Sequence, residues 1–157
     1  MLLNIQDYFT FEVIYTWSTF GVMPFWLILI FFPNTKISQI FVNSIIAPLI
    51  LAIAYGFVIY QTILMEYSIL ENFQLYLGLD NLYALFSNEN ILLVFWLHFL
   101  AINLFLGSWV SRDAVKYNIS RGLTSVPLIL IYLTGPVGLI LYWVIRIFYS
   151  KKINFND

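Results

Sequence analysis

The sequence predicts an all-α polytopic membrane protein: a single integral-membrane domain over residues 1–157 that forms a bundle of four transmembrane helices, with short interfacial helices between the second and the third. Of its 157 residues, 62% are hydrophobic and only 10% are charged, and the mean hydropathy is +0.89. A soluble domain of this size has too small a core to hide so much apolar surface, so lipid must be the solvent. Four apolar stretches are also long enough to cross a hydrocarbon core of ~30 Å, which needs roughly 20 residues.

The first three spans follow from the apolar runs and the polar turns that bound them. The first runs from about residue 11 to 32 and ends at Pro33-Asn34-Thr35-Lys36, a turn sequence. The second runs from about 39 to 64, and Pro48 is expected to kink it. The third runs from about 91 to 110, with Asn88 or Asn90 as its N-cap.

The fourth span, about 123–149, is interrupted by Gly135-Pro136-Val137-Gly138. We expect a single kinked helix, because each half is too short to cross a membrane alone. The alternative is two half-helices with a re-entrant break at Gly135-Pro136.

The connection over residues 65–90 differs from the spans because it is acidic. It carries Glu66, Glu71, Asp80 and Glu89 and no basic residue. Apolar residues recur at helical spacing on two faces, which predicts two short helices lying on the membrane surface. Asp80 is the expected N-cap of the second.

Composition excludes several functions. There is no cysteine, so disulfides, thiolate nucleophiles and cysteine metal sites are absent. The net charge is −1 without a basic run, and we expect no nucleic-acid partner. The first twelve residues hold no Lys or Arg and no cleavage site follows, so we expect no cleaved signal or transit peptide.

The distribution of Lys and Arg only weakly predicts the orientation of the chain in the membrane. Four follow the first and third spans (Lys36, Arg112, Lys116 and Arg121), and three follow the fourth (Arg146, Lys151 and Lys152). With four spans, the group of four and the group of three lie on opposite sides of the membrane. Because the larger group is expected in the cytoplasm, the positive-inside rule slightly favours an orientation with both termini outside.

The stretch from Trp96 to Trp109 carries the candidate chemistry. It holds the only histidine, His98, and Asn103, within otherwise apolar sequence. A polar group in hydrocarbon is costly without a partner, so such residues raise a functional hypothesis. His98 is the candidate proton donor or acceptor, with Asn103 on an adjacent wall of one cavity. The alternative is a structural histidine bonded to a hydroxyl or carbonyl of a neighbouring helix.

One histidine with these neighbours is a poor ligand set for a metal ion, and we expect neither a metal nor another cofactor.

Four further residues are candidates for substrate binding. Trp26 and Trp96 either flank an apolar ligand or belong to the aromatic belts of the membrane surface. Gly107 indicates close helix packing. Asp113, beside Arg112, either closes a cavity mouth or belongs to a solvated helix end in contact with lipid headgroups.

Two blocks of this sequence resemble a known family. The first is Leu82-Tyr-Ala-Leu-Phe-Ser-Asn88, then Trp96-x-His98-x-Leu-Ala101-x-Asn103-Leu-Phe-x-Gly107-x-Trp109 and Asp113. The second is Pro127, then Gly135-Pro136-Val137-Gly138-Leu-x-Leu-Tyr142 and Arg146. Together they resemble the abscisic-acid-deficient-four-like family of small membrane proteins, the neoxanthin-synthesis proteins of plants. The likeness covers roughly residues 82–146 and is weak before them.

The resemblance implies a four-helix membrane protein related to the conversion of violaxanthin to neoxanthin. That reaction opens an epoxide and forms an allene, with an acid near the epoxide oxygen and a base near the polyene carbon; His98 would carry over as one of these. The family usually has Asp where this chain has Asn103, and an amide cannot accept a proton or carry charge.

These observations support two main hypotheses. In the first, the chain is a multi-pass protein that binds or isomerises a carotenoid or other isoprenoid drawn laterally from membrane lipid, in the inner membrane if bacterial. In the second, it is a non-enzymatic assembly or scaffold subunit of that membrane. Transport is less favoured, because four helices with so few ionisable groups line a polar path poorly unless the protein forms a homo-oligomer.

Overall fold

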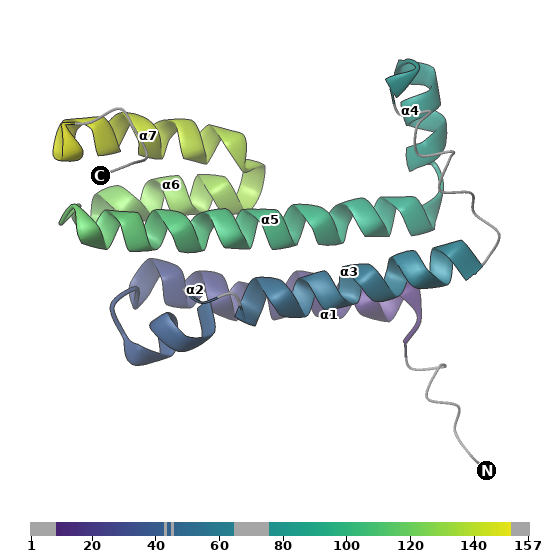
Figure 1. Cartoon of the computed structure of the whole chain (residues 1–157), viewed down its shortest axis with the longest axis horizontal. Coiled ribbons are helices and arrows are strands. Elements are labelled where there is room, and N and C mark those ends of the chain that lie inside the picture. The colour runs from purple at the N-terminus through teal and green to yellow at the C-terminus, as the bar shows by residue number, and fades with distance from the viewer. Residues whose placement is uncertain (1–8, 43, 45, 65–75, 152–157) are drawn as a thin grey trace, which may run out of the picture.

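The computed structural model describes residues 9–42, 44, 46–64 and 76–151, and all the regular elements within them are helices. The elements are α1 (Phe11–Gly21), α2 (Met23–Phe31), the π-helix η2 (Ser38–Val42), α3 (Ile46–Leu64), α4 (Leu79–Phe86), α5 (Glu89–Lys116), α6 (Arg121–Thr134) and α7 (Pro136–Ser150). Figure 1 shows an elongated bundle in which α5 runs through the middle, with α1, α2 and α3 on one side and α6 and α7 on the other.

Helices α1 and α2 together form the first predicted span. They follow one another over Phe11–Phe31, which is long and apolar enough to cross a membrane. Thr10 caps α1, because its hydroxyl accepts a hydrogen bond from the Val13 amide at 3.3 Å. The division at Val22 lies just before Pro24, whose ring removes a donor and crowds the preceding turn.

The second predicted span corresponds to η2 and α3, whose apolar stretch runs over Ser38–Thr62. Pro48 was expected to kink this span. It lies in the first turn of α3, where a missing amide hydrogen breaks no helical hydrogen bond, and α3 continues to Leu64.

Helix α5 contains the third predicted span and is longer than predicted at both ends. Its 28 residues extend ~42 Å at 1.5 Å per residue, enough to cross the hydrocarbon and reach both headgroup layers. Of the two candidate caps, Asn88 is the cap: its side chain accepts a hydrogen bond from the Asn90 amide at 2.9 Å. Because α5 packs against α1, α2, α3, α4, α6 and α7, it organises the bundle.

The expectation of a single kinked fourth helix is wrong. The chain ends α6 at Thr134, turns at Gly135 with φ +70°, and begins α7 at Pro136. Helix α7 then runs back along α6, and a Cβ atom at Gly138 would fall on the backbone of Pro127 and Ile131. The alternative, two half-helices with a break at Gly135-Pro136, is the observed one. Their 14 and 15 residues each extend ~21–23 Å, too short to cross a membrane.

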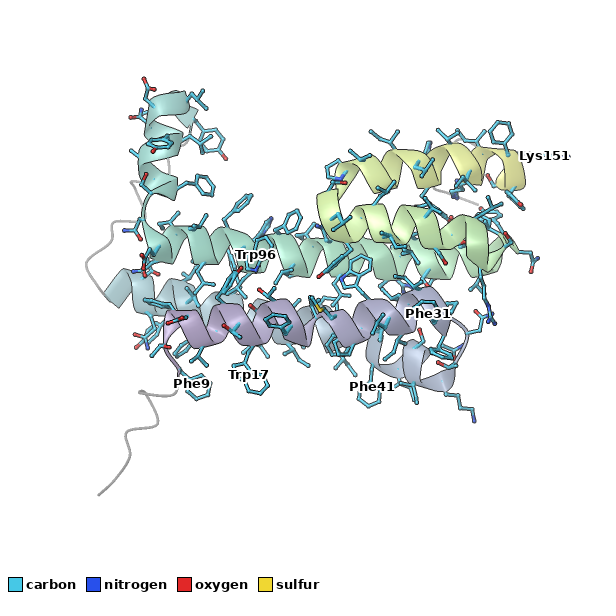
Figure 2. All side chains as sticks on the ribbon, turned by 180° about the vertical axis from the view of Figure 1, so that it is seen from behind. Phe9, Trp17, Phe31, Phe41, Trp96 and Lys151 are labelled. Carbon is cyan, nitrogen blue, oxygen red and sulfur yellow. The ribbon has the colours of Figure 1, made fainter. Side chains whose placement is uncertain are left out.

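Within the described residues, three helical stretches are therefore long and apolar enough to span a membrane: Phe11–Phe31, Ser38–Thr62 and Glu89–Lys116. Their outer surface is apolar. Phe9, Trp17, Phe31 and Phe41 are 49–74% exposed, and Phe9, Trp17 and Phe41 project away from the bundle in Figure 2. Such a surface suits a lipid environment.

The prediction of two interfacial helices in the acidic connection can be compared with the structure only in the second half of that connection. Residues 65–75, which include the first predicted interfacial helix, lie outside the described residues. The second predicted helix exists as α4, which stands out from the bundle in Figure 1 with Leu79 and Tyr83 exposed. Gly78, not Asp80, occupies the N-cap position, and Asp80 lies in the first turn, where its charge complements the helix dipole.

The hairpin changes the distribution of charge. Because α7 returns beside α6, Arg146 and Lys151 lie at the same end of the bundle as Arg112, Lys116 and Arg121 (Figure 1). Lys36, between α2 and η2, lies there too. We call this the basic end. The opposite end carries Glu12, Asp80 and Glu89, three of the four described acidic side chains, and the fourth, Asp113, is paired with Arg146 at the basic end.

Candidate functional site

A broad apolar groove lies between α1 and α3. Its volume is about 1070 Å³, slightly above the usual range for small-molecule sites. Aliphatic and aromatic side chains line it apart from two polar ones, Ser18 and Gln61. Trp17 on its rim is 74% exposed, so the groove opens sideways, in the direction from which lipid would reach the bundle. The lining is Phe9, Val13, Ile14, Trp17, Ser18, Gly21, Val22, Phe25, Ala47, Ile50, Leu51, Ile53, Ala54, Phe57 and Gln61.

The groove is elongated, because its lining on α3 extends from Ala47 to Gln61. These fourteen steps along the helix correspond to roughly 20 Å. Small residues on both helices, such as Gly21 and Ala54, leave the space between the walls unfilled. A long, narrow and apolar ligand is the class that this shape accepts.

His98 lies on a different face, between α5 and α3. It is exposed at the surface of the bundle, and its ring centroid lies 6.0 Å from that of Tyr55 on α3. His98 does not line the groove. The structure therefore places this residue where a molecule dissolved in the surrounding lipid could touch it.

Trp96 joins α5 to α1. Its indole Nε1 donates a hydrogen bond to Thr19 Oγ1 at 2.9 Å, and its ring stacks on Phe99 with centroids 5.6 Å apart. It is partly buried and also does not line the groove. Its contacts are those of a residue that packs helices together.

Asn103 faces the turn of the α6–α7 hairpin. It is 6% exposed, and its Oδ1 lies 2.7 Å from the position that a Cβ atom would take at Gly135. Its Nδ2 has no hydrogen-bond partner among the described residues. The hairpin turn therefore reaches the middle of α5, and Asn103 is held against it rather than beside His98.

Trp26 and Gly107 are brought together. The Trp26 side chain is 3% exposed, and its Cη2 lies 2.6 Å from where a Cβ atom would be at Gly107. On its other side, the Trp26 ring lies 5.4 Å from Tyr132 of α6. Only a glycine at position 107 lets the indole sit this close to α5, so this pair fixes α2 against α5 and α6.

Asp113 lies in a buried polar cluster at the basic end. Its Oδ2 accepts hydrogen bonds from the Tyr142 hydroxyl at 2.6 Å and from Arg146 Nε at 2.7 Å. Arg146, 1% exposed, also donates through Nη2 to the Tyr117 hydroxyl at 3.2 Å and lies over the rings of Tyr117 and Trp143. Burial, and then the hydrogen bond to Asp113, raise the pKa of Tyr142 well above its usual range, so its hydroxyl stays protonated and remains a donor.

The six predicted site residues therefore occupy five separate surroundings, and only Trp26 and Gly107 are brought together. Sequence reasoning missed the partners of Asp113. The signal for one of them was present, because Arg146 is the only charged residue in the apolar sequence from Pro136 to Ser150. In the described part of the chain, no group of three His, Asp or Glu side chains could hold a metal ion.

One of three comparisons with known proteins, the scan against family models, agrees with the resemblance in the sequence. Neither the curated proteins nor the solved structures gave a match. The sequence model of the ABA4-like family (ABA DEFICIENT 4-like) matches residues 13–142, which run from the first turn of α1 through the hairpin turn into α7. The apolar helices and this match together identify an integral membrane protein related to neoxanthin synthesis. The chain belongs to the ABA4-like family.

Proposed function

We propose that this protein takes a carotenoid or a related isoprenoid from the bilayer into the groove between α1 and α3. The groove itself carries the proposal, because it is long, apolar and open at the side. Because a polyene would move from apolar lipid into an apolar groove, close van der Waals packing against the walls would stabilise it, rather than removal of apolar surface from water. The membership of a family related to neoxanthin synthesis directs the choice among apolar ligands toward carotenoids.

The polar lining suits the ends of such a molecule. Gln61 lies near the C-terminus of α3, at the end of the groove that faces the acidic end of the bundle. An amide can donate to and accept from the hydroxyl or epoxide oxygen of a carotenoid ring. The apolar middle of the groove then holds the polyene.

Conversion of the ligand is a further proposal, centred on His98. Opening an epoxide to an allene breaks a C–O bond, removes a proton from the polyene and protonates the oxygen, so the product is an isomer. His98 is the candidate acid because a histidine side chain can donate a proton to the epoxide oxygen. His98 is exposed beside Tyr55, so the end ring of a carotenoid can reach it from the surrounding lipid. Asn103, the second predicted catalytic residue, contacts the hairpin instead and would act through the packing of α5.

We also propose how the chain lies in the membrane. The three long apolar helices cross it, and α6 and α7 enter from the basic end and return to it. With all the described Lys and Arg at one end, the positive-inside rule places that end in the cytoplasm, in the inner membrane if the source is bacterial.

Pigment retention tests the binding proposal. The protein is expressed in cells that make hydroxy- and epoxy-carotenoids, purified in mild detergent, and its pigment is measured by absorbance and chromatography. Gly21 lines the groove and has no atom within 4 Å of its Cβ position, so Gly21→Phe can start a bulky side chain there and should occupy part of the groove. Gly56, on α3 outside the groove, has the same free space and gives the matched control Gly56→Phe.

We expect the wild type and Gly56→Phe to retain pigment in proportion to protein, and Gly21→Phe to lose most of it. Equal retention by both variants would place the pigment elsewhere. A wild type that carries no pigment and leaves the cellular pigments unchanged would overturn the proposal in favour of an assembly subunit. A new pigment isomeric with a supplied one would add the isomerase activity.

A further inference from the structure

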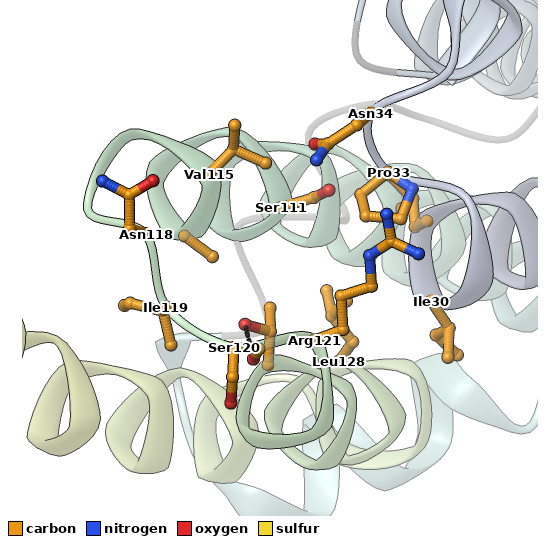
Figure 3. Close-up of a pocket in the computed structure, with 13 residues that line it drawn as sticks. Ile30, Pro33, Asn34, Ser111, Val115, Asn118, Ile119, Ser120, Arg121 and Leu128 are labelled. Carbon is orange, nitrogen blue, oxygen red and sulfur yellow. Dashed lines mark hydrogen bonds between the residues drawn. The ribbon is translucent and has the colours of Figure 1, made fainter.

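A second cavity, at the basic end, is polar where the groove is apolar. It lies where the C-terminal part of α5, the N-terminus of α6 and the end of α2 meet, and it encloses about 260 Å³ (Figure 3). That volume is below the usual range for small-molecule sites, so it suits a headgroup or an inorganic ion rather than a pigment. The lining is Leu29, Ile30, Pro33, Asn34, Ser111, Ala114, Val115, Asn118, Ile119, Ser120, Arg121, Thr124 and Leu128.

The N-terminus of α6 forms one wall. Helix α6 begins at Arg121, and the preceding Ser120 makes no side-chain capping hydrogen bond. Thr124 donates its hydroxyl hydrogen to the Ser120 carbonyl at 3.0 Å rather than capping the helix. Backbone N–H groups in a first turn carry the positive end of the helix dipole and bind anions.

Ser111, on the opposite wall, gives an independent indication. It is 1% exposed, and its Oγ has no hydrogen-bond partner among the described residues. A buried hydroxyl without a partner destabilises the folded protein, so a native protein rarely keeps one without a reason. Its oxygen lies among the side chains of the cavity in Figure 3, on the side of Asn34 and Pro33.

The charge of the lining selects the ligand. Arg121 is the only charged side chain among the lining residues, and no carboxylate lines the cavity. The carboxylate at this end, Asp113, is engaged by Tyr142 and Arg146 in the neighbouring cluster. Figure 3 shows the Arg121 guanidinium and the Asn34 amide on the same side of the cavity as the Ser111 hydroxyl. Guanidinium, amide, hydroxyl and backbone N–H are together the donor set that recognises a phosphate.

We propose that this cavity binds a phosphate group, with Arg121, Ser111 and the first turn of α6 as its donors. It lies at the end of the helices that would cross the membrane, among apolar side chains such as Leu29 and Leu128 that suit the glycerol part of a lipid. The headgroup of an anionic phospholipid satisfies both features, and a soluble phosphate monoester offers the same oxygens. This site does not depend on the pigment groove.

Thermal unfolding of the purified full-length chain in detergent separates the sources. The probes are phosphatidylglycerol, diacylglycerol with the same acyl chains, and inorganic phosphate. Phosphatidylglycerol should raise the melting temperature saturably, and diacylglycerol, which lacks the phosphate, should not. Saturable stabilisation by inorganic phosphate that also displaces phosphatidylglycerol would identify a soluble ligand. Equal effects of the two lipids together with no effect of phosphate would overturn the proposal.

Three variants test the residues. Arg121→Gln should weaken phosphatidylglycerol binding by roughly tenfold, because it removes a charge-assisted hydrogen bond. Arg112→Gln is its matched control: Arg112 is exposed at the same end but does not line the cavity, so its binding should stay close to wild type. Ser111→Ala should leave the lipid-free protein at least as stable as the wild type, because it removes a costly unpaired hydroxyl, and should still weaken binding. Equal loss in Arg121→Gln and Arg112→Gln would mean general attraction to a basic surface and would overturn the site.

Discussion

Arg146 of α7 donates a hydrogen bond from Nε to Asp113 Oδ2 of α5 over 2.7 Å, across 33 residues of sequence. The pair joins the returning half of the hairpin to the central helix. Arg146 is 1% exposed and the Asp113 side chain 11%, so neither charge has much water around it. The hairpin is thereby anchored at the basic end, while its turn rests against Asn103 near the middle of α5.

Removing the carboxylate should loosen the hairpin. Asp113→Ala leaves Arg146 buried with no anionic partner, which typically costs about 3–5 kcal/mol. We expect a large fall in the thermal unfolding midpoint and faster proteolysis after α5. Arg112→Ala, an exposed position one residue away, should change stability by less than about 0.5 kcal/mol. An Asp113→Ala protein as stable as this control would mean that the pair does not hold the hairpin.

The contact between Trp26 and Gly107 predicts a specific intolerance. Gly107→Ala places a methyl group 2.6 Å from the indole Cη2, an overpacking that typically costs 1–3 kcal/mol. Trp26→Phe removes that part of the ring, so Gly107→Ala should cost less in the Trp26→Phe background. Gly56→Ala, with no atom within 4 Å of its Cβ position, should stabilise the protein by about 0.5–1 kcal/mol. Thermal unfolding of all variants measures this coupling, and additive effects would contradict it.

His98→Ala should separate binding from conversion. The side chain is exposed, so its removal should change stability by no more than about 0.5 kcal/mol. If His98 supplies the proton, pigment conversion in cells is abolished while pigment retention by the purified protein stays near wild type. Gly21→Phe should lower both. An unchanged yield of the isomeric product in His98→Ala would exclude the catalytic role.

The first three spans could be predicted because their signal is local. Each is a continuous apolar run that ends at a polar or capping residue, such as Pro33 or Asn88, and neither feature depends on the rest of the fold. The fourth could not, because its length is ambiguous. Residues 123–149 can form one long helix or two short ones, and the choice depends on the close approach of Gly138 to the backbone of Pro127 and Ile131. That contact exists only after the chain has turned.

The candidate site was less predictable than the fold. His98 and Asn103 stand out because they are polar in an apolar helix, but which helix each faces depends on packing. The groove contains no unusual residue type, so nothing in the sequence points to it. The cluster around Asp113 could be predicted only in part. Arg146 lies in an apolar helix and therefore requires a partner, but the sequence does not indicate which acidic residue provides it.

The side of the membrane on which the C-terminal end lies distinguishes the hairpin from a fourth span. The chain has no native cysteine, so single cysteines can be placed at Lys116, Lys151 and Glu89 and labelled with a membrane-impermeant reagent. If α6 and α7 return to the basic end, the cysteines at 116 and 151 are labelled from the same side and the one at 89 from the other, because only α5 lies between positions 89 and 116. A complete crossing by residues 123–149 would instead put position 151 on the side of position 89. Labelling after detergent lysis is the control for reactivity, since all three positions should then react.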